Sequence, residues 1–371
     1  MSKIPTIAMI PSGYKANKLY SVLPTNGDGD LTTARTSTAT RVNEIGLIED
    51  VATGVPRLDY TGGGCPALLI EPQSTNYYFP SEGTDATLTS PYGSFGFYEL
   101  GVSAISKAIN YVGQVSVSFI VKRQDGLLPT ISSSGGSGDI GVVINGSSLA
   151  GTGGVLTAIS DGYYKYTLED YTSDGTSFFQ VVTYSANTTY VSLVQYENSS
   201  YATSYIPTSG STATRVAETL SKGSLSSYIN SVEGVLYAEM KALADNGDNY
   251  KISLSNGSDD NAITINLSSV LNTVTCSVRI GGGVIQTQNA TGITKTDYNK
   301  IAFKYSENNF AIYINGVKED ELLSGSIFSA DTLNKLSFDR GNSADLFYGN
   351  VKDLRVFNEA LSDAELVTLT T

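Results

Sequence analysis

The sequence predicts an all-β protein built from antiparallel β-sandwich domains, and three observations favour this fold class. Apolar side chains recur at every second position in several segments, as at Val115, Val117, Phe119 and Val121, which is the period of a strand with one buried face. The 37 glycines and the many Ser, Thr and Asn residues are typical of tight turns. Only 16% of residues are charged, and no helical pattern separates the strand candidates. We expect two tandem antiparallel sandwiches, with the jelly roll as one form, after an extended N-terminal segment, and a short C-terminal helix.

The length of 371 residues allows two or three folded units at about 150 residues each. A near-repeat, Ser37-Thr-Ala-Thr-Arg-Val42 and Ser211-Thr-Ala-Thr-Arg-Val216, indicates exit-strand or linker elements. We predict four regions in this order: an N-terminal segment with short strands at 1–88, a β-sandwich at 89–208, a linker at 209–218, and a second β-sandwich at 219–371.

The N-terminal segment contains only short strand candidates, at 19–23, 46–49 and 67–70, separated by Pro, Gly and Asp. Such short strands seldom build a core of their own. We expect the segment to fold against a partner, against the next domain, or against copies of itself.

The two predicted sandwiches have separate sets of period-two strands. Beyond the strand around Val117, the first sandwich has candidates at 140–144, 164–168, 178–184 and 191–196. The second has candidates at 235–240, 251–254, 263–267, 274–280, 301–305 and 310–314. Asn315-Gly316 predicts a two-residue hairpin, because the favoured turn needs positive φ at both positions.

The chain closes with a strand at 349–358 and a predicted helix start at Ser362. Ser362 and Glu365 have the spacing of a capping box, in which each side chain bonds the other residue's backbone amide. Leu361 and Leu366 stand at the hydrophobic staple positions that fix how the chain enters the helix.

The end of the sequence resembles laminin-G-like, concanavalin A-like sandwich domains. The resemblance rests on the closing stretch from Phe347 to Leu366, with Asn-Val-Lys-Asp-Leu-Arg-Val-Phe-Asn at its centre, and on Asn309-Phe-Ala-Ile-Tyr-Ile-Asn-Gly316 before it. It covers roughly residues 219–371 and implies a lectin-like sandwich. The middle sandwich resembles a carbohydrate-binding-module jelly roll, an analogy of fold that transfers no function.

Two further stretches resemble tailed-bacteriophage virion proteins of the head-spike and tail-fibre type. They are the stretch 36–76, ending in Leu-Leu-Ile-Glu-Pro-Gln-Ser-Thr-Asn76, and Tyr201-Ala-Thr-Ser-Tyr-Ile-Pro-Thr-Ser-Gly-Ser-Thr-Ala-Thr-Arg215. The resemblance implies a virion protein, made in the host cytoplasm and attached to other virion proteins through residues 1–88. It also implies self-association, with a trimer as one form, and contact with host-surface glycan.

Charge and hydropathy exclude some partners. The net charge of −13 repels phosphate backbones, so we expect no nucleic acid partner. No apolar run approaches the ~18–20 residues of a membrane helix, and the first residues lack a standard export signal, so we expect no membrane insertion. Cys65 and Cys276 are far apart, and we expect them in different domains without a disulfide.

The absence of histidine removes Ser-His-Asp and Cys-His catalysis and the commonest metal ligand. Glycoside cleavage needs only two carboxyl groups, but no Glu-x-Asp-x-(x)-Glu pattern lies on a predicted strand. Glu319-Asp320-Glu321 is interpreted as a solvated loop, and Asp363 with Glu365 as a helix cap. Gly62–Gly64 and Gly281–Gly283 lack the lysine and helix of a phosphate site. We expect no enzyme, and assign no catalytic, cofactor-binding or metal-binding residue.

The resemblance to laminin-G-like domains implies calcium as the ion, with oxygen ligands in Asn256-Gly-Ser-Asp-Asp260 and Asp339. An acidic surface turn is the simpler interpretation of the same residues. Sugar sites usually have an exposed aromatic platform. The chain has no Trp but has 24 Tyr, including the adjacent pairs Tyr77-Tyr78 and Tyr163-Tyr164. One ring of each pair would point away from a core on a strand, toward a neighbouring subunit or solvent, and we assign no sugar-binding residue.

Three functions remain open on this evidence. The first is a structural component of a phage particle (head fibre or spike, tail fibre or decoration protein) whose displayed sandwiches adhere to host glycan. The second is a true lectin or receptor-binding protein. The third is a glycan depolymerase, which requires two carboxyl groups about 5–10 Å apart in a cleft.

Overall fold

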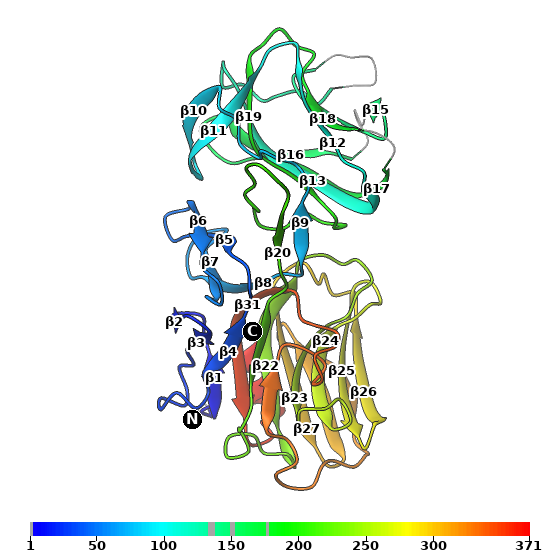
Figure 1. Ribbon diagram of the computed structural model, residues 1–371. Coiled ribbons are helices and arrows are strands. Elements are labelled where there is room, and N and C mark those ends of the chain that lie inside the picture. Colours follow the sequence, from blue (N-terminus) through cyan, green and yellow to red (C-terminus); the bar gives the residue numbers. More distant parts are fainter. Residues whose placement is uncertain (1–2, 133–137, 149–152, 176–177) are drawn as a thin grey trace. The chain divides into compact units, whose positions relative to one another are not determined.

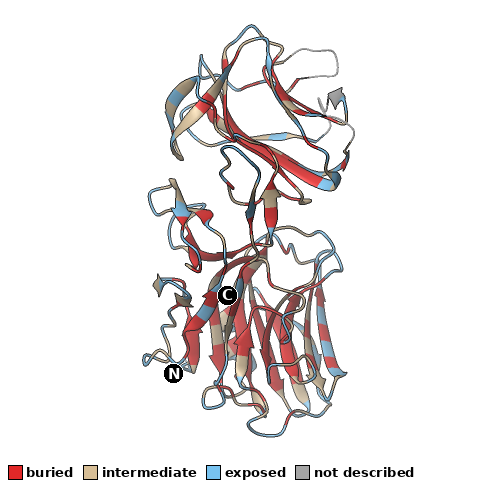
Figure 2. Cartoon of the chain, in the orientation of Figure 1, coloured by how far each residue is buried: buried red, intermediate tan, exposed pale blue. Residues whose placement is uncertain are grey.

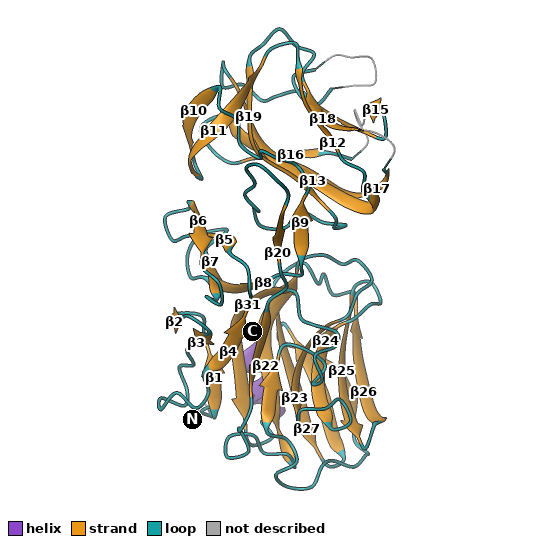
Figure 3. Cartoon of the chain, in the orientation of Figure 1, coloured by secondary structure: helices purple, strands orange, loops and turns teal. Residues whose placement is uncertain are grey.

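The computed structural model describes residues 3–132, 138–148, 153–175 and 178–371, and it confirms the all-β fold class. Within these residues every regular element is a β-strand except the helix α1, Asp363–Thr370 (Figure 3). No helix in these ranges has the length and apolar character needed to span a bilayer.

The described chain forms two compact units, each made of separate stretches of sequence. Unit 1 comprises Met1–Thr36, Ala52–Pro72 and Ala217–Thr371, and unit 2 comprises Ser37–Val51 and Gln73–Val216. These units differ from the predicted order of 1–88, 89–208, 209–218 and 219–371. The predicted linker contains strand β20, Ala213–Arg215, which pairs with β9, Ser74–Asn76, in unit 2.

Unit 1 is a sandwich of two antiparallel sheets (Figure 1). In its described residues, sheet A has the order β29-β28-β27-β22-β31-β8-β7, with β1 also paired to β31. The bounds are β1 Ile7–Met9, β7 Arg57–Asp59, β8 Ala67–Ile70, β22 Glu233–Ala242, β27 Asn299–Ser306, β28 Asn309–Ile314, β29 Val317–Leu322 and β31 Gly349–Phe357.

Sheet B of the same unit has the order β2-β3-β4-β21-β30-β23-β24-β25-β26. The bounds are β2 Tyr14–Lys15, β3 Lys18–Leu19, β4 Leu31–Ala34, β21 Thr219–Lys222, β23 Tyr250–Ser255, β24 Ala262–Leu267, β25 Thr273–Ile280, β26 Gly283–Thr291 and β30 Lys335–Ser337.

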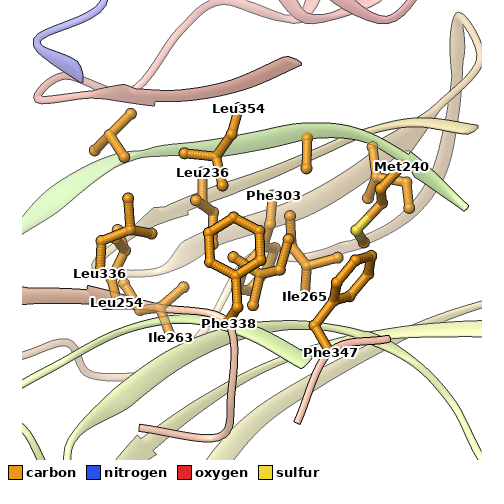
Figure 4. Close-up of a cluster of buried hydrophobic side chains, with 14 of the residues drawn as sticks. Leu236, Met240, Leu254, Ile263, Ile265, Phe303, Leu336, Phe338, Phe347 and Leu354 are labelled. Carbon is orange, nitrogen blue, oxygen red and sulfur yellow. The ribbon is translucent and has the colours of Figure 1, made fainter. Parts of the chain in front are cut away.

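The core of unit 1 lies between sheets A and B, where alternate side chains of each strand meet. Figure 2 shows that much of the length of these strands is buried. Figure 4 shows Leu236 and Phe303 of sheet A facing Leu254 and Ile263 of sheet B, with Phe338 beside them. All are at most 2% exposed. Burying each such side chain contributes about 1.5–3 kcal/mol, so this alternation is the main stabilising feature of the unit.

The N-terminal segment contributes side chains to this core, so it folds against a domain of the same chain. Its buried apolar side chains are Ile7, Met9, Leu19, Leu31, Leu58, Leu68 and Ile70. Strands of two to four residues cannot enclose a core by themselves, but as additional strands of sheets A and B they bury one face at little cost. Residues up to 36 and from 52 to 72 therefore fold against residues 217–371.

A buried cluster of four charged residues joins these stretches: Arg35, Arg57, Glu71 and Glu218. Arg57 is 0% exposed; its Nε lies 2.9 Å from Glu218 Oε1 and its Nη1 lies 2.6 Å from Glu71 Oε2. Arg35 also donates to Glu218. Burial alone would lower the pKa of Arg57, but the two carboxylates raise it above its ordinary value. The Arg57 guanidinium thus stays charged, and the cluster is stable only while its members stay paired.

Unit 2 contains two further antiparallel sheets and a hairpin. Its sheet C has the order β10-β11-β19-β13-β17-β16 with β9 and β20, and sheet D the order β12-β18-β14-β15. The bounds are β5 Ala39–Val42, β6 Ile48–Val51, β10 Ala86–Ser90, β11 Gly93–Leu100, β12 Ala104–Ala108, β13 Val112–Arg123, β14 Gly141–Ile144, β15 Ser147–Ser148, β16 Val155–Ala158, β17 Tyr163–Asp174, β18 Phe178–Val182 and β19 Thr189–Glu197.

The alternation predicted around Val117 is confirmed in β13, because Val115, Val117, Phe119 and Val121 are at most 1% exposed. Phe119 stacks on Tyr166 of the paired strand with ring centroids 4.6 Å apart. Sheets C and D supply the other side chains of this core.

The two local signals at the end of unit 1 are also confirmed. Asn315 and Gly316 have φ values of 50° and 85° and connect β28 to β29. Ser362 N donates to Glu365 Oε2 at 2.9 Å, and Glu365 N donates to Ser362 Oγ at 3.4 Å. Leu361 and Leu366 are buried against the outer face of sheet A, so α1 covers that face.

Asp139 gives unit 2 an expected dependence on acid pH. Its carboxylate accepts hydrogen bonds from Thr130 N at 2.9 Å and Arg123 Nη1 at 2.8 Å. Burial would raise the pKa of Asp139, but the hydrogen bonds outweigh it and lower the pKa to about 2. The ordinary value is about 3.9, so this stabilisation is present above pH ~4 and is lost as the pH falls towards 2. Thermal unfolding midpoints of unit 2 should fall over that window, and less steeply in Asp139→Asn; equal slopes would contradict the assignment.

Candidate functional site

The outer face of sheet B carries a row of hydroxyl side chains. Leu254, Ile263 and Cys276 point into the core from β23, β24 and β25. The residues next to them on the same strands therefore point outward. Strand register places seven hydroxyl residues at successive facing positions: Thr32, Ser221, Ser337, Ser253, Thr264, Ser277 and Thr287. Two neighbouring pairs are bonded, Ser253 Oγ to Ser337 Oγ at 3.1 Å and Thr264 Oγ1 to Ser277 Oγ at 2.7 Å.

A pocket of about 170 Å³ opens at this row. We call it the sheet B pocket; its lining residues are Lys251, Thr264, Asn266, Thr275, Ser277, Arg279, Val284, Thr287 and Arg340. The wall contains three cationic side chains and, among the described residues, no carboxylate. A cation-lined wall of hydroxyl and amide groups suits a polar ligand that carries negative charge.

The three cationic side chains of the sheet B pocket contact nearby aspartates. Arg279 Nε donates to the backbone oxygen of Asp259 at 2.8 Å, and Arg340 Nη2 lies 3.0 Å from Asp259 Oδ2. Lys251 Nζ lies 2.7 Å from Asp345 Oδ2. Each of the three cations is therefore paired with Asp259 or Asp345.

Two polar atoms of the pocket residues have no hydrogen-bond partner among the described residues, Asn266 Oδ1 and Arg340 Nε. Asn266 is 7% exposed, and its Nδ2 donates to Asn249 Oδ1 at 2.9 Å. Buried polar atoms are normally paired with protein or water. Asn266 and Arg340 therefore each keep one buried polar atom that is not paired with a described residue.

The oxygen-rich residues predicted as calcium ligands are engaged with protein groups. Asp259 pairs with Arg340, and Asp339 Oδ1 accepts from Ser337 Oγ at 2.9 Å. Asn256 Oδ1 accepts from the Ser258 amide at 3.1 Å. Within the described ranges no group of three or more His, Cys, Asp or Glu side chains could hold a metal.

Other predicted features lie elsewhere. Glu319-Asp320-Glu321 is part of strand β29 and not of a loop: Asp320 and Glu321 pair with β28, and Glu319 lies at a shift in the register. Asp363 Oδ2 lies 2.6 Å from Lys318 Nζ. This hydrogen bond, together with those from Tyr313 and Lys304, lowers the pKa of Asp363 to about 2. Gly62–Gly64, Gly281 and Gly282 lie at turns or bends with positive φ, and Gly283 begins strand β26.

The cysteine and tyrosine predictions need correction. Cys65 and Cys276 belong to the same unit, because residues 52–72 fold with residues 217–371; Cys65 is exposed, Cys276 is buried, and both are free thiols. Tyr163 does not face solvent: it is 3% exposed and packs in a second apolar cluster on the outer face of sheet C. Tyr78 is 3% exposed, and Tyr77 packs against Tyr111 with ring centroids 5.3 Å apart.

Sequence reasoning assigned none of the pocket residues. In the sequence these residues are the polar positions that alternate with apolar ones along a strand. Examples are Thr264 and Asn266 in one strand, and Thr275, Ser277 and Arg279 in the next. Alternation shows that such residues face outward but not that strands from distant parts of the chain place them side by side.

Comparison with known proteins identifies the C-terminal part of the chain. Residues 236–367 match the family described as the concanavalin A-like lectin/glucanases superfamily. No curated protein matches the sequence.

Several solved structures share low similarity with the chain. The CBM40 of the Ruminococcus gnavus IT-sialidase bound to α2,3-sialyllactose is 19% identical over 38% of this chain and 83% of that chain, with a TM-score of 0.34. The K499G mutant of NanB sialidase from Streptococcus pneumoniae is 18% identical over 40% of this chain and 26% of that chain, with a TM-score of 0.33. A heptameric SAP-like pentraxin from Limulus polyphemus is 12% identical over 38% of this chain and 71% of that chain, with a TM-score of 0.30.

Scores at this level transfer no ligand or activity. The family match is the informative result, and it spans the strands from β22 to β31 and most of α1. The chain therefore carries a C-terminal concanavalin A-like, laminin-G-like domain.

Proposed function

We propose that this chain is a non-enzymatic structural component of a tailed-bacteriophage particle that adheres to acidic host glycans through the sheet B pocket. The observation that carries the glycan part is the pocket wall, in which Lys251, Arg279 and Arg340 stand among outward hydroxyl groups. The lectin-type family match of residues 236–367 supports a binding role.

The pocket chemistry favours binding over cleavage. Glycoside hydrolysis needs a pair of carboxyl groups flanking the scissile bond, and none lines the described wall of the pocket. The chain as a whole carries a net charge of −13, so only cations close to the ligand attract an acidic sugar; beyond a Debye length of about 8–10 Å the surrounding charge is screened.

The virion part rests on the sequence resemblance at 36–76 and 201–215. We propose attachment to other virion proteins through residues 1–88, in which Ile4 of unit 1 and Ile45 of unit 2 are 78% and 72% exposed. Self-association, as a trimer for example, would present many copies, and avidity would compensate for weak single sites. We propose no nucleic acid partner.

Titration calorimetry of the intact chain with 3′-sialyllactose and with lactose tests the glycan proposal. We expect the acidic sugar to bind more tightly, and Lys251→Met to weaken its binding about tenfold, as for a lost charged hydrogen bond. Lys165→Met, in unit 2, is the matched control and should bind as the parent does. Equal binding of both sugars, or parental affinity in Lys251→Met, would contradict the proposal.

A further inference from the structure

Sheet A carries a second polar hollow on its outer face, beside α1. This sheet A groove has a volume of about 690 Å³, within the range of about 300–1,000 Å³ found for small-ligand sites. Its floor comes from β22 and β31, and one side comes from α1 and the residues before it. The lining residues are Lys3, Tyr237, Glu239, Lys300, Asp353, Arg355, Phe357, Leu361, Ala364, Glu365, Thr368 and Leu369.

Two carboxylates face each other on the floor of the groove. Glu239 of β22 is the direct partner of Asp353 on β31, and facing residues of such strands have Cβ atoms about 4.5–5.5 Å apart. Arg355 neutralises Asp353 with a two-pronged contact, Nη2 to Oδ2 at 2.6 Å and Nε to Oδ1 at 3.1 Å. Glu239 has no ion pair or hydrogen bond among the described residues, since the facing Lys300 donates to the backbone oxygen of Thr371 at 2.6 Å.

Tyr237 provides a second, independent sign of a ligand. The side chain is 2% exposed and lines the groove, yet its hydroxyl forms no hydrogen bond within the described part of the chain. Burial, and then the nearby Asp353 and Glu239 carboxylates, raise the pKa of Tyr237. Tyr237 and Glu239 are two positions apart on β22, so both side chains lie on the groove face of sheet A, and the Tyr237 hydroxyl can donate to a group bound there.

We propose that the sheet A groove is a second ligand site of unit 1 that binds a neutral, hydroxyl-rich sugar unit. Tyr237 donates to a sugar hydroxyl, Glu239 accepts from one, and the more exposed Ala364 and Leu369 of α1 give the groove an apolar side for the C–H face of the ring. The lining contains three cations and three carboxylates, so the groove has no net preference for an acid, in contrast to the sheet B pocket. It uses other residues on the other sheet, so it goes beyond the function proposed above.

The test uses NMR spectroscopy of the intact chain labelled with ¹³C at tyrosine Cζ. The tyrosine signals are followed during titration with maltotriose, cellotriose, N-acetyllactosamine and 3′-sialyllactose. The Tyr237 signal is assigned by its loss in Tyr237→Phe. We expect it to shift with at least one neutral sugar, and Glu239→Gln to weaken that binding about tenfold or more. Glu233→Gln, on the same strand, is the matched control, and Lys251→Met should leave the Tyr237 response unchanged.

Three outcomes would overturn the inference: no Tyr237 shift with any neutral sugar, an unchanged response in Glu239→Gln, or hydrolysis of a sugar, which would make the facing carboxylates catalytic. Loss of acidic-sugar binding in Lys251→Met with an intact Tyr237 response supports both sites. The sheet B proposal and this one therefore fail separately.

Discussion

Glu218→Ala is expected to lower the free energy of unfolding of unit 1 by about 3–5 kcal/mol. Glu218 bonds to both Arg35 and Arg57, which are 3% and 0% exposed. Removing the carboxylate leaves two buried guanidinium groups with too few acceptors, and the cost of burying unpaired charge exceeds that of the lost contacts. Urea unfolding monitored by near-ultraviolet circular dichroism measures the change.

Two further variants separate this effect from the loss of any acidic residue. Glu233→Ala removes a half-buried carboxylate from the same unit and should change stability by less than about 0.5 kcal/mol. Replacing the four cluster residues together by Met and Leu should cost less than Glu218→Ala alone, because no unpaired charge remains. A Glu218→Ala protein as stable as its parent would show that the cluster contributes nothing.

Deletion of residues 1–36 is expected to prevent unit 1 from folding. The deletion removes β1 to β4 and four core side chains, Ile7, Met9, Leu19 and Leu31, that are at most 1% exposed. At about 1.5–3 kcal/mol each they contribute roughly 6–12 kcal/mol, which is comparable with the total stability of about 5–15 kcal/mol of a typical domain. Soluble yield and resistance of residues 217–371 to limited proteolysis measure the result.

The same deletion distinguishes the two interpretations of the N-terminal segment. If these strands were only an attachment arm, the shortened chain would unfold at the same temperature as the full chain. Adding a peptide of residues 1–36 to the shortened chain should partly restore protease resistance, whereas a peptide of the same composition in scrambled order should not.

Local patterns predicted the parts of the fold that depend on neighbouring residues. The period-two strand around Val117, the Asn315-Gly316 hairpin and the Ser362 cap each depend on contacts within a few residues of the chain, and each is confirmed. The domain boundaries were not predictable in this way, because β1 pairs with β31 through Ile7 and Val356. No local period shows that two such distant short strands share a sheet.

The candidate site was less predictable than the fold for the same reason. The sheet B pocket combines β23 to β26 with Arg340 from the segment after β30, and its polar residues look like ordinary solvent-facing positions in the sequence. Glu239 and Asp353 were equally inconspicuous, because the strand register that makes them neighbours joins positions more than a hundred residues apart.

The interleaved composition of the two units affects how the chain folds during synthesis. The strand containing Ile7 leaves the ribosome long before its partner at Val356, and at about 5–20 residues per second that delay is roughly 20–70 s. Unit 2 is complete once residue 216 has emerged, so it can fold first. The early strands of unit 1 meanwhile have unpaired edges, and this interval is when the nascent chain most needs a chaperone.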